Sequence, residues 1–142
     1  MSVVSSVIAR LKETGSPFAL VEGAVDLAAV DTRPPATPAA YVLAAEEASA
    51  ENTRATGPVL QRMEADIAVV IITDNLTDRV MGEAAGDIED LKAWVRGKLI
   101  GFEPDGADEP MEHVSGQIVK ARSGTVWFDD RFAASTYLEE QS

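Results

Sequence analysis

The sequence contains no cysteine among its 142 residues. This absence excludes disulfides, thiolate metal ligands and cysteine nucleophiles, and it is compatible with a reducing compartment. Histidine occurs only once, as His113. A Ser-His-Asp catalytic arrangement would have to use this residue, yet no serine lies in a nucleophile-elbow pattern. We therefore interpret His113 as a solvent-exposed residue at the start of a strand.

Basic residues are also scarce, with 12 Lys and Arg against 24 Asp and Glu, which gives a formal net charge of −12. A chain of this charge repels phosphate groups, so direct binding to nucleic acids or anionic membranes is disfavoured. Long apolar runs are missing too. The longest, Ile67–Ile72, is far shorter than the roughly 20 residues that a membrane-spanning helix needs. No secretion signal is apparent, and we expect a soluble protein.

Motifs for catalysis or cofactor binding are absent from the sequence. There is no GxGxxG and no GxxxxGK[ST]. The oxygen-rich run from Glu103 to Glu112 lacks the ligand spacing and turn glycine of a calcium-binding EF-hand loop, so a solvated acidic loop is the simpler interpretation. The adjacent carboxylates Asp129 and Asp130 would point to opposite faces of a strand, which is poor geometry for acid–base catalysis. A metal-dependent enzyme that uses the acidic loop and His113 remains the alternative from another class.

What the sequence does contain is a hydrophobic fraction of 46%, enough for the core of one domain over residues 1–142. Two helices are predicted by apolar residues at helical spacing. The first carries Val4, Val7, Ile8 and Leu11 and ends before Gly15. The second spans about Glu83 to Ile100, with Ile88, Leu91, Val95 and Leu99 on one face.

Strands are predicted in several further segments, of which Val59–Thr73 is the clearest because it starts with period-two alternation and becomes apolar on both faces. The others are Phe18–Glu22, Ala40–Ala44, Val114–Arg122, Thr125–Phe128 and, as a last edge strand, Phe132–Leu138. Ala24–Val30 is compatible with a weak helix, a proline-rich linker runs from Arg33 to Pro38, Asp74–Met81 is a polar connection, and Ser123-Gly124 forms a tight turn. This order predicts a single α+β domain, with an antiparallel or mixed sheet and two helices packed on one face.

A long connection at residues 46–58 separates two predicted strands and is made of small, acidic and polar residues. Loops of this length are usually functional or disordered. A disordered tip and a segment that contacts a partner therefore both remain open. Tyr41 and Trp127 belong either to a wide core or to an interface, where aromatic residues are enriched. The candidate interface residues are Tyr41, Glu46, Glu47, Glu51, Asn52, Arg54 and Trp127.

Several segments, taken in order, resemble the tail terminator proteins of long-tailed bacteriophages and prophages. They are "VVSSVIARLKE", "PAAYVLAAEEASAEN", "VLQRMEADIAVVII", "DIEDLKAWVRGKLIGFEP" and "GTVWFDDRF". The resemblance covers nearly the whole chain and lies in the order and spacing of these segments. One departure is Phe102, where the family often has tryptophan.

The resemblance implies a small α/β fold that assembles into a homohexameric ring without catalysis or cofactor. Such a ring caps the tail tube, stops its polymerisation and provides a surface for joining to the head. The implied partners are other copies of the chain, the tail tube protein and a head-completion or neck protein. DNA would pass through the ring without specific binding. The implied location is the head-proximal end of the tail in the virion, and the host cytoplasm during assembly. A head–tail connector or neck protein and a monomeric binding domain remain alternatives.

Overall fold

The computed structural model describes residues 1–142 except for 32, 75–80, 123 and 142. The described chain folds as an α+β domain with a mixed sheet, as the sequence predicts, and it has five strands and three helices. The elements, in chain order, are α1 (Val3–Leu11), β1 (Leu20–Gly23), α2 (Ala24–Ala28), β2 (Ala39–Ser49), β3 (Leu60–Asp74), α3 (Met81–Leu99), β4 (Glu112–Arg122) and β5 (Thr125–Glu139). The strand order is β1-β2-β3-β5-β4, in which β1 runs parallel to β2 and the other neighbours are antiparallel.

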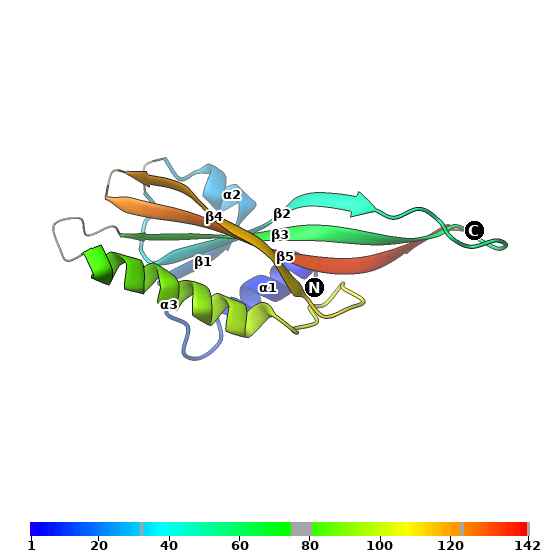
Figure 1. Cartoon of the computed structure of the whole chain (residues 1–142), viewed down its shortest axis with the longest axis horizontal. Coiled ribbons are helices and arrows are strands. Elements are labelled where there is room, and N and C mark those ends of the chain that lie inside the picture. Colours follow the sequence, from blue (N-terminus) through cyan, green and yellow to red (C-terminus); the bar gives the residue numbers. More distant parts are fainter. Residues whose placement is uncertain (32, 75–80, 123, 142) are drawn as a thin grey trace.

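The two predicted helices, α1 and α3, cover one face of the sheet and enclose the main core (Figure 1). The apolar residues of α3 at helical spacing are all buried, and Val95 and Leu99 are completely inaccessible. They pack with Val7 and Leu11 of α1 and with Ile67, Val69 and Ile71 of β3. Burial of an aliphatic side chain of this size stabilises the fold by about 1.5–3 kcal/mol. The helical periodicity therefore identified the side chains that attach both helices to the sheet.

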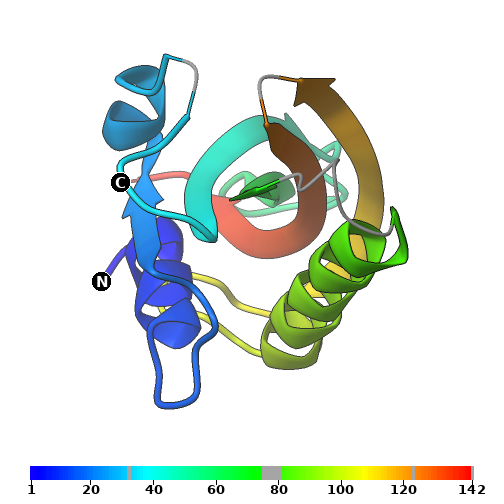
Figure 2. The same ribbon diagram turned by 90° about the vertical axis from the view of Figure 1, so that its left-hand side faces the viewer.

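The short helix α2 lies apart from the other two helices and packs against the opposite face of the sheet. Figure 2, which looks along the long axis from the end opposite the C-terminus, shows α1 and α3 below the curled sheet and α2 at the upper left. A smaller core cluster forms here from Ala39, Tyr41, Val70, Ile72 and Trp127. Leu27 of α2 packs against it. Both faces of β3 are thus covered at its C-terminal end, which explains the apolar run on both faces.

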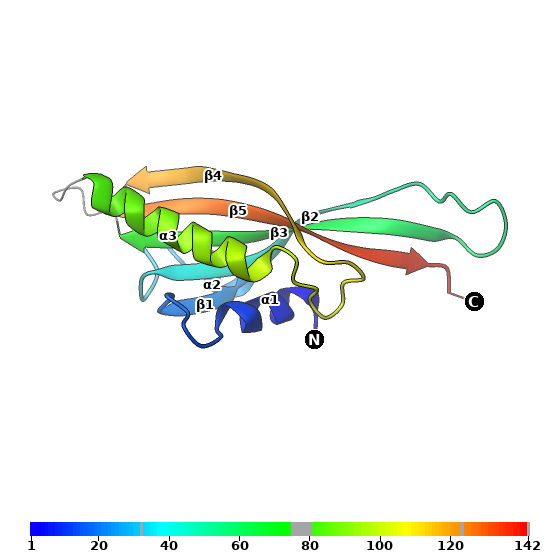
Figure 3. The ribbon, with the colours of Figure 1, turned by 60° about the horizontal axis from the view of Figure 1, so that its bottom comes forward.

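The long strands extend well past the helices and form an arm, which we define as residues 46–66 and 133–141. β3 and β5 have 15 residues each, about 50 Å at 3.3 Å per residue. In contrast, α3 has 19 residues and a length of about 28 Å at 1.5 Å per residue. Figure 3 shows the ends of β2, β3 and β5 projecting from the helical part, with the C-terminus at the tip. Beyond Ala65 and Ala134, which still belong to the main core, the arm is therefore a three-stranded sheet that the helices of the same chain leave uncovered.

Two predicted boundaries were wrong. The connection at 46–58 is shorter than expected, because β2 continues to Ser49 and pairs with β3 as far as Met63. The predicted strands Thr125–Phe128 and Phe132–Leu138 are one strand, β5, which lies between β3 and β4 and not at an edge. In both cases charged residues interrupt the apolar pattern, while pairing with β3 continues through them. The predicted polar connection falls largely on residues 75–80, and the predicted turn includes Ser123; both lie outside the described residues.

Candidate interaction site

The predicted interface residues divide between the arm and the core. Glu46 and Glu47 lie on the arm segment of β2, and Glu51, Asn52 and Arg54 lie in the connection at its end. All five are on the same projecting part of the molecule. Tyr41 and Trp127, in contrast, are 0% and 9% exposed within the smaller core cluster. Their side chains alternate onto the face that packs by α2, so they stabilise this chain's own core. Contact of any of the seven with another subunit stays a prediction.

The connection between β2 and β3 has a hydrogen-bonded structure of its own. The Asn52 carboxamide oxygen accepts from the backbone nitrogens of Arg54 and Leu60, at 3.3 and 3.1 Å. The Arg54 guanidinium donates to the Pro58 carbonyl at 3.1 Å and forms an ion pair with Glu139 at 3.5 Å. Gly57 adopts φ +90°, a conformation that glycine reaches without strain. These interactions tie the connection to the first residue of β3 and the last residue of β5. The acidic and amide side chains at the tip of the arm are therefore held in a defined arrangement.

A polar network fixes the base of the arm to the acidic loop that follows α3. Arg62 donates to both carboxylate oxygens of Glu109, at 3.2 and 2.9 Å, and to Ser135 Oγ at 2.7 Å. The Tyr137 hydroxyl donates to Glu109 at 2.9 Å. Hydrogen bonds from Arg62 and Tyr137 lower the pKa of Glu109 below its ordinary value, because both favour the ionised carboxylate. The same interaction raises the pKa of Tyr137. Glu109 is therefore a structural partner of the arm.

The acidic loop also continues the pairing along β5 ahead of the first residue of β4. The backbone nitrogen of Asp108 donates to the Ser135 carbonyl, and its carboxylate accepts from the Tyr137 backbone nitrogen at 2.9 Å. Asp108 and Glu109 thus have partners within the chain, although Asp108 is exposed and Glu109 is partly exposed, as expected for a solvated acidic loop. Among the described residues there is no group of three or more His, Asp or Glu side chains placed to hold a metal ion.

His113 lies in a second network, which joins β4, β5 and α3. Its Nε2 atom is 2.7 Å from Oδ1 of Asp130, and its ring packs edge-on against Phe132 with centroids 5.2 Å apart. Arg96 of α3 donates to the same carboxylate with two bonds, at 3.1 and 3.0 Å. Asp130 is completely buried. His113 is therefore at a strand start, as predicted, but it is paired and only partly exposed, because the β4–β5 register places it beside Asp130.

The opposite face of the sheet carries a group of carboxylates, of which Asp129 is buried and Glu46 is exposed. Asp129 points to this face, away from Asp130 as predicted, and pairs with Arg131 at 3.1 Å. Arg131 also approaches Glu46 at 3.9 Å. Towards the tip, a shallow depression is lined by Glu46, Glu47, Ala48, Glu64 and Asp66. Acidic side chains thus dominate this face of the arm, with Arg131 and Arg62 at its two sides.

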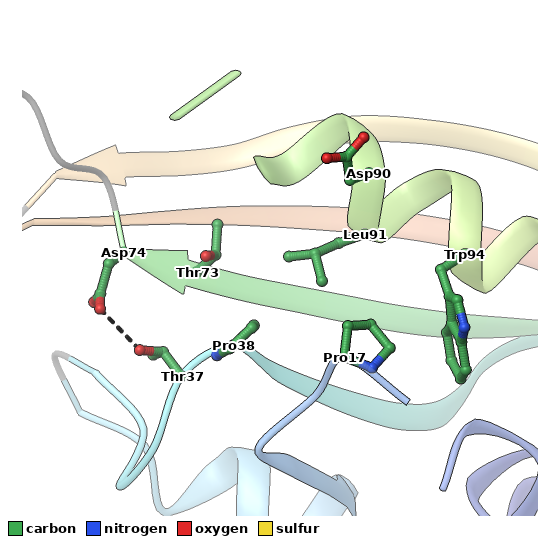
Figure 4. Close-up of a pocket in the computed structure, with 8 residues that line it drawn as sticks. All are labelled: Pro17, Thr37, Pro38, Thr73, Asp74, Asp90, Leu91 and Trp94. Atoms are coloured by element: carbon green, nitrogen blue, oxygen red, sulfur yellow. Dashed lines mark hydrogen bonds between the residues drawn. The ribbon is translucent and has the colours of Figure 1, made fainter. Parts of the chain in front are cut away.

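A cavity lies elsewhere, between α3 and the end of β3 (Figure 4). It has a volume of about 550 Å³, and its described lining consists of Pro17, Thr37, Pro38, Thr73, Asp74, Asp90, Leu91 and Trp94. Thr37 donates to Asp74 at 2.9 Å. Trp94 packs edge-on against Phe18 at a centroid distance of 5.9 Å. The described lining residues include no histidine or lysine that could act as a base. The sequence alone gave no signal for this cavity, since its lining comes from four separate segments.

Helices that could cross a membrane are not found among the described residues, because none of them is both long and apolar enough.

Comparison with known proteins addresses the role of this architecture. A family model described as phage tail terminator protein matches residues 1–142. A search of curated protein sequences gives no match. One similar solved structure is a chain described as "Virion of native gene transfer agent (GTA) particle", with a TM-score of 0.59 and 17% sequence identity, covering 98% of this chain and 96% of that chain. At this identity the likeness shows a shared fold. The family match spans the entire sequence, and the chain therefore belongs to the phage tail terminator family, with a structural role in the assembly of the phage tail.

Proposed function

We propose that the chain forms a homohexameric ring that caps the tail tube, ends its polymerisation and offers a surface for joining to the head. The observation that carries this proposal is the family match over the whole chain. The fold supports it, because the arm extends the sheet beyond the helices and exposes a surface that does not serve the core of a single subunit. The proposed ring is a structural part of the virion at the head-proximal end of the tail, without catalysis or cofactor.

The arm is the part of the molecule that we assign to contacts with other subunits. A ring subunit must present one surface to each neighbour and another to the tube, so surfaces at its extremities are required. Glu46, Glu47, Glu51, Asn52 and Arg54 lie on the arm or at its tip and are free of core packing. Paired backbone and the Arg62–Glu109 network hold the arm in place before assembly. This preorganisation lowers the entropic cost of association.

The negative charge of the chain is compatible with a channel for DNA. A ring through which DNA passes should not retain it, and acidic side chains repel phosphates. Glu46, Glu47, Glu64 and Asp66 form an uncovered acidic surface on the arm. We propose that such carboxylates, and not basic residues, line the passage. A ring whose channel is lined by Lys and Arg would contradict this part of the proposal.

Removal of the arm tip separates its role from that of the core. A variant that lacks residues 51–57 should retain the fold, since these exposed residues do not belong to either core cluster. It should, however, fail to form rings or to cap tubes made from purified tail tube protein, as seen by light scattering and electron microscopy. A control variant, Val25→Ser, changes an exposed residue on α2 that is remote from the arm. Rings and capped tubes formed by the deletion variant would contradict the assignment of the tip. Binding to the head vertex but not to tube ends would favour a connector or neck protein.

A further inference from the structure

Most of the exposed large apolar side chains of the described residues lie at two places, while Met1, Val25 and Ile100 lie elsewhere. One is the arm tip patch, which consists of Val59 and Leu138, exposed by 37% and 45%. The backbone nitrogen of Glu140 donates to the Val59 carbonyl, so the residue before β3 and the residue after β5 lie side by side at the end of the arm. The register of β3 and β5 places Val59 and Leu138 on the same face of the sheet. The other is the β4 patch, which consists of Val114, Ile118 and Val119, exposed by 47%, 60% and 55%. Apolar side chains grouped in this way mark interaction surfaces more often than isolated ones do.

The β4 patch exists because of the way this edge strand pairs. The register with β5 shifts between His113 and Ser115 and again between Ile118 and Lys120. Val114 and Val119 are therefore the extra residues of two bulges, which re-aim side chains at a sheet edge. Edge strands of monomeric proteins usually carry charged residues that discourage association. From Val114 to Val119, β4 has none.

The two patches have flanking charges of opposite sign. Around the arm tip patch, Glu51, Glu139 and Glu140 outnumber Arg54. β4 from Val114 to Arg122, in contrast, contains Lys120 and Arg122 and no acidic residue, although the chain as a whole has twice as many acids as bases. Lys120 lies beside the β4 patch, with its ammonium 4.0 Å above the Trp127 ring. An acidic rim on one patch and a basic segment on the other would attract each other between two molecules.

We propose that the arm tip patch of one copy binds the β4 patch of the next copy. This inference rests on the proposed ring and names the surfaces that build it. Because the two patches differ, the contact is head-to-tail, and any open chain of copies keeps one free arm tip patch at one end and one free β4 patch at the other until the assembly closes. Contacts of this kind generate rings when the rotation between copies closes. The long arm is what allows a tip on one subunit to reach β4 of its neighbour.

Disulfide cross-linking tests the pairing without interference from native thiols, since the chain has no cysteine. The variants Leu138→Cys and Ile118→Cys, mixed in equal amounts under mild oxidation, should give a cross-linked 1:1 pair, at least tenfold more than either variant alone. The variant Val25→Cys, at a position that is 84% exposed on α2, serves as the control and should cross-link with neither. Cross-linking of Leu138→Cys with itself, or no product from the mixture at millimolar concentration, would overturn the head-to-tail pairing.

Charge substitutions separate a failure of the pairing from a failure of the ring. Leu138→Lys and Ile118→Lys should each abolish rings in light scattering, while a mixture of the two should form 1:1 pairs, because one intact contact remains possible between them. Val25→Lys should assemble like the unmodified chain. Circular dichroism would verify that all three variants fold. If both patch variants formed normal rings, the pairing would be wrong and the ring would stand. If the unmodified chain formed no ring even with tube protein, the proposed function itself would fail.

Discussion

Replacement of Asp130 by asparagine should weaken the fold measurably, because this completely buried carboxylate of β5 joins that strand to α3 and β4. Asp130 is 0% exposed, and it accepts two hydrogen bonds from Arg96 of α3 and lies 2.7 Å from Nε2 of His113 on β4. Asparagine keeps the shape but removes the charge and one acceptor oxygen. The positive charge of the Arg96 guanidinium, which is partly buried, then loses the negative charge that balances it.

The magnitude follows from the exposure of the partners. Loss of one partner of a buried ion pair costs about 3–5 kcal/mol. The side chains of Arg96 and His113 are 34% and 28% exposed, so water can replace part of the interaction. We therefore expect a loss of about 2–3 kcal/mol in the free energy of unfolding. With an unfolding entropy of about 2.1 cal/mol/K per residue, a chain of 142 residues should lose about 7–10 °C in Tm.

Urea unfolding followed by circular dichroism measures this loss directly, and thermal scans provide the change in Tm. Both should be made at a fixed concentration, because assembly stabilises the folded state by mass action. Glu89→Gln is the matched control, since Glu89 pairs with Lys92 but its side chain is 64% exposed. Exposed pairs of this kind contribute about 0–1 kcal/mol. An Asp130→Asn variant as stable as the control would refute the structural role of the network.

Two further changes test packing and charge. Gly116→Ala should destabilise the fold by about 1–3 kcal/mol in urea unfolding, as overpacking does. The reason is that a Cβ at this position would lie 2.8 Å from Phe128 and 2.9 Å from Asp130. An unchanged unfolding midpoint would show that these two side chains move aside freely. The lowered pKa of Glu109 predicts stability that is present above the ordinary glutamate pKa of about 4.3 and lost as pH falls through the lower folded value. Glu109→Gln should reduce this acid sensitivity, and equal pH profiles for variant and unmodified chain would contradict it.

The sequence predicted those parts of the fold whose signal is local. Helical spacing in α1 and α3 and the double-sided apolar run of β3 identified the core, since burial of a face depends on residues within one element. The charged residues in β5 gave a misleading signal. Asp129, Asp130 and Arg131 suggested a break between two strands, but they lie inside one strand, because Asp129 pairs with Arg131 and Asp130 pairs with Arg96, which is distant in sequence.

The candidate site was predictable only in part for a similar reason. Acidic and amide residues near the arm tip stood out because they could form no core, and five of the seven candidates do lie there. Tyr41 and Trp127 could have belonged to either environment, and only the position of α2 shows that they are buried. The β4 patch escaped notice, since it arises from two bulges in pairing with β5, and bulges cannot be read from the sequence of one strand.

The proposed ring and its capping role are tested most directly by electron microscopy of tubes assembled from purified tail tube protein with and without this chain. The proposal predicts that the chain adds a six-fold ring at one end of each tube and stops elongation there. Tubes that keep lengthening with no ring at either end, in the presence of excess folded protein, would contradict it.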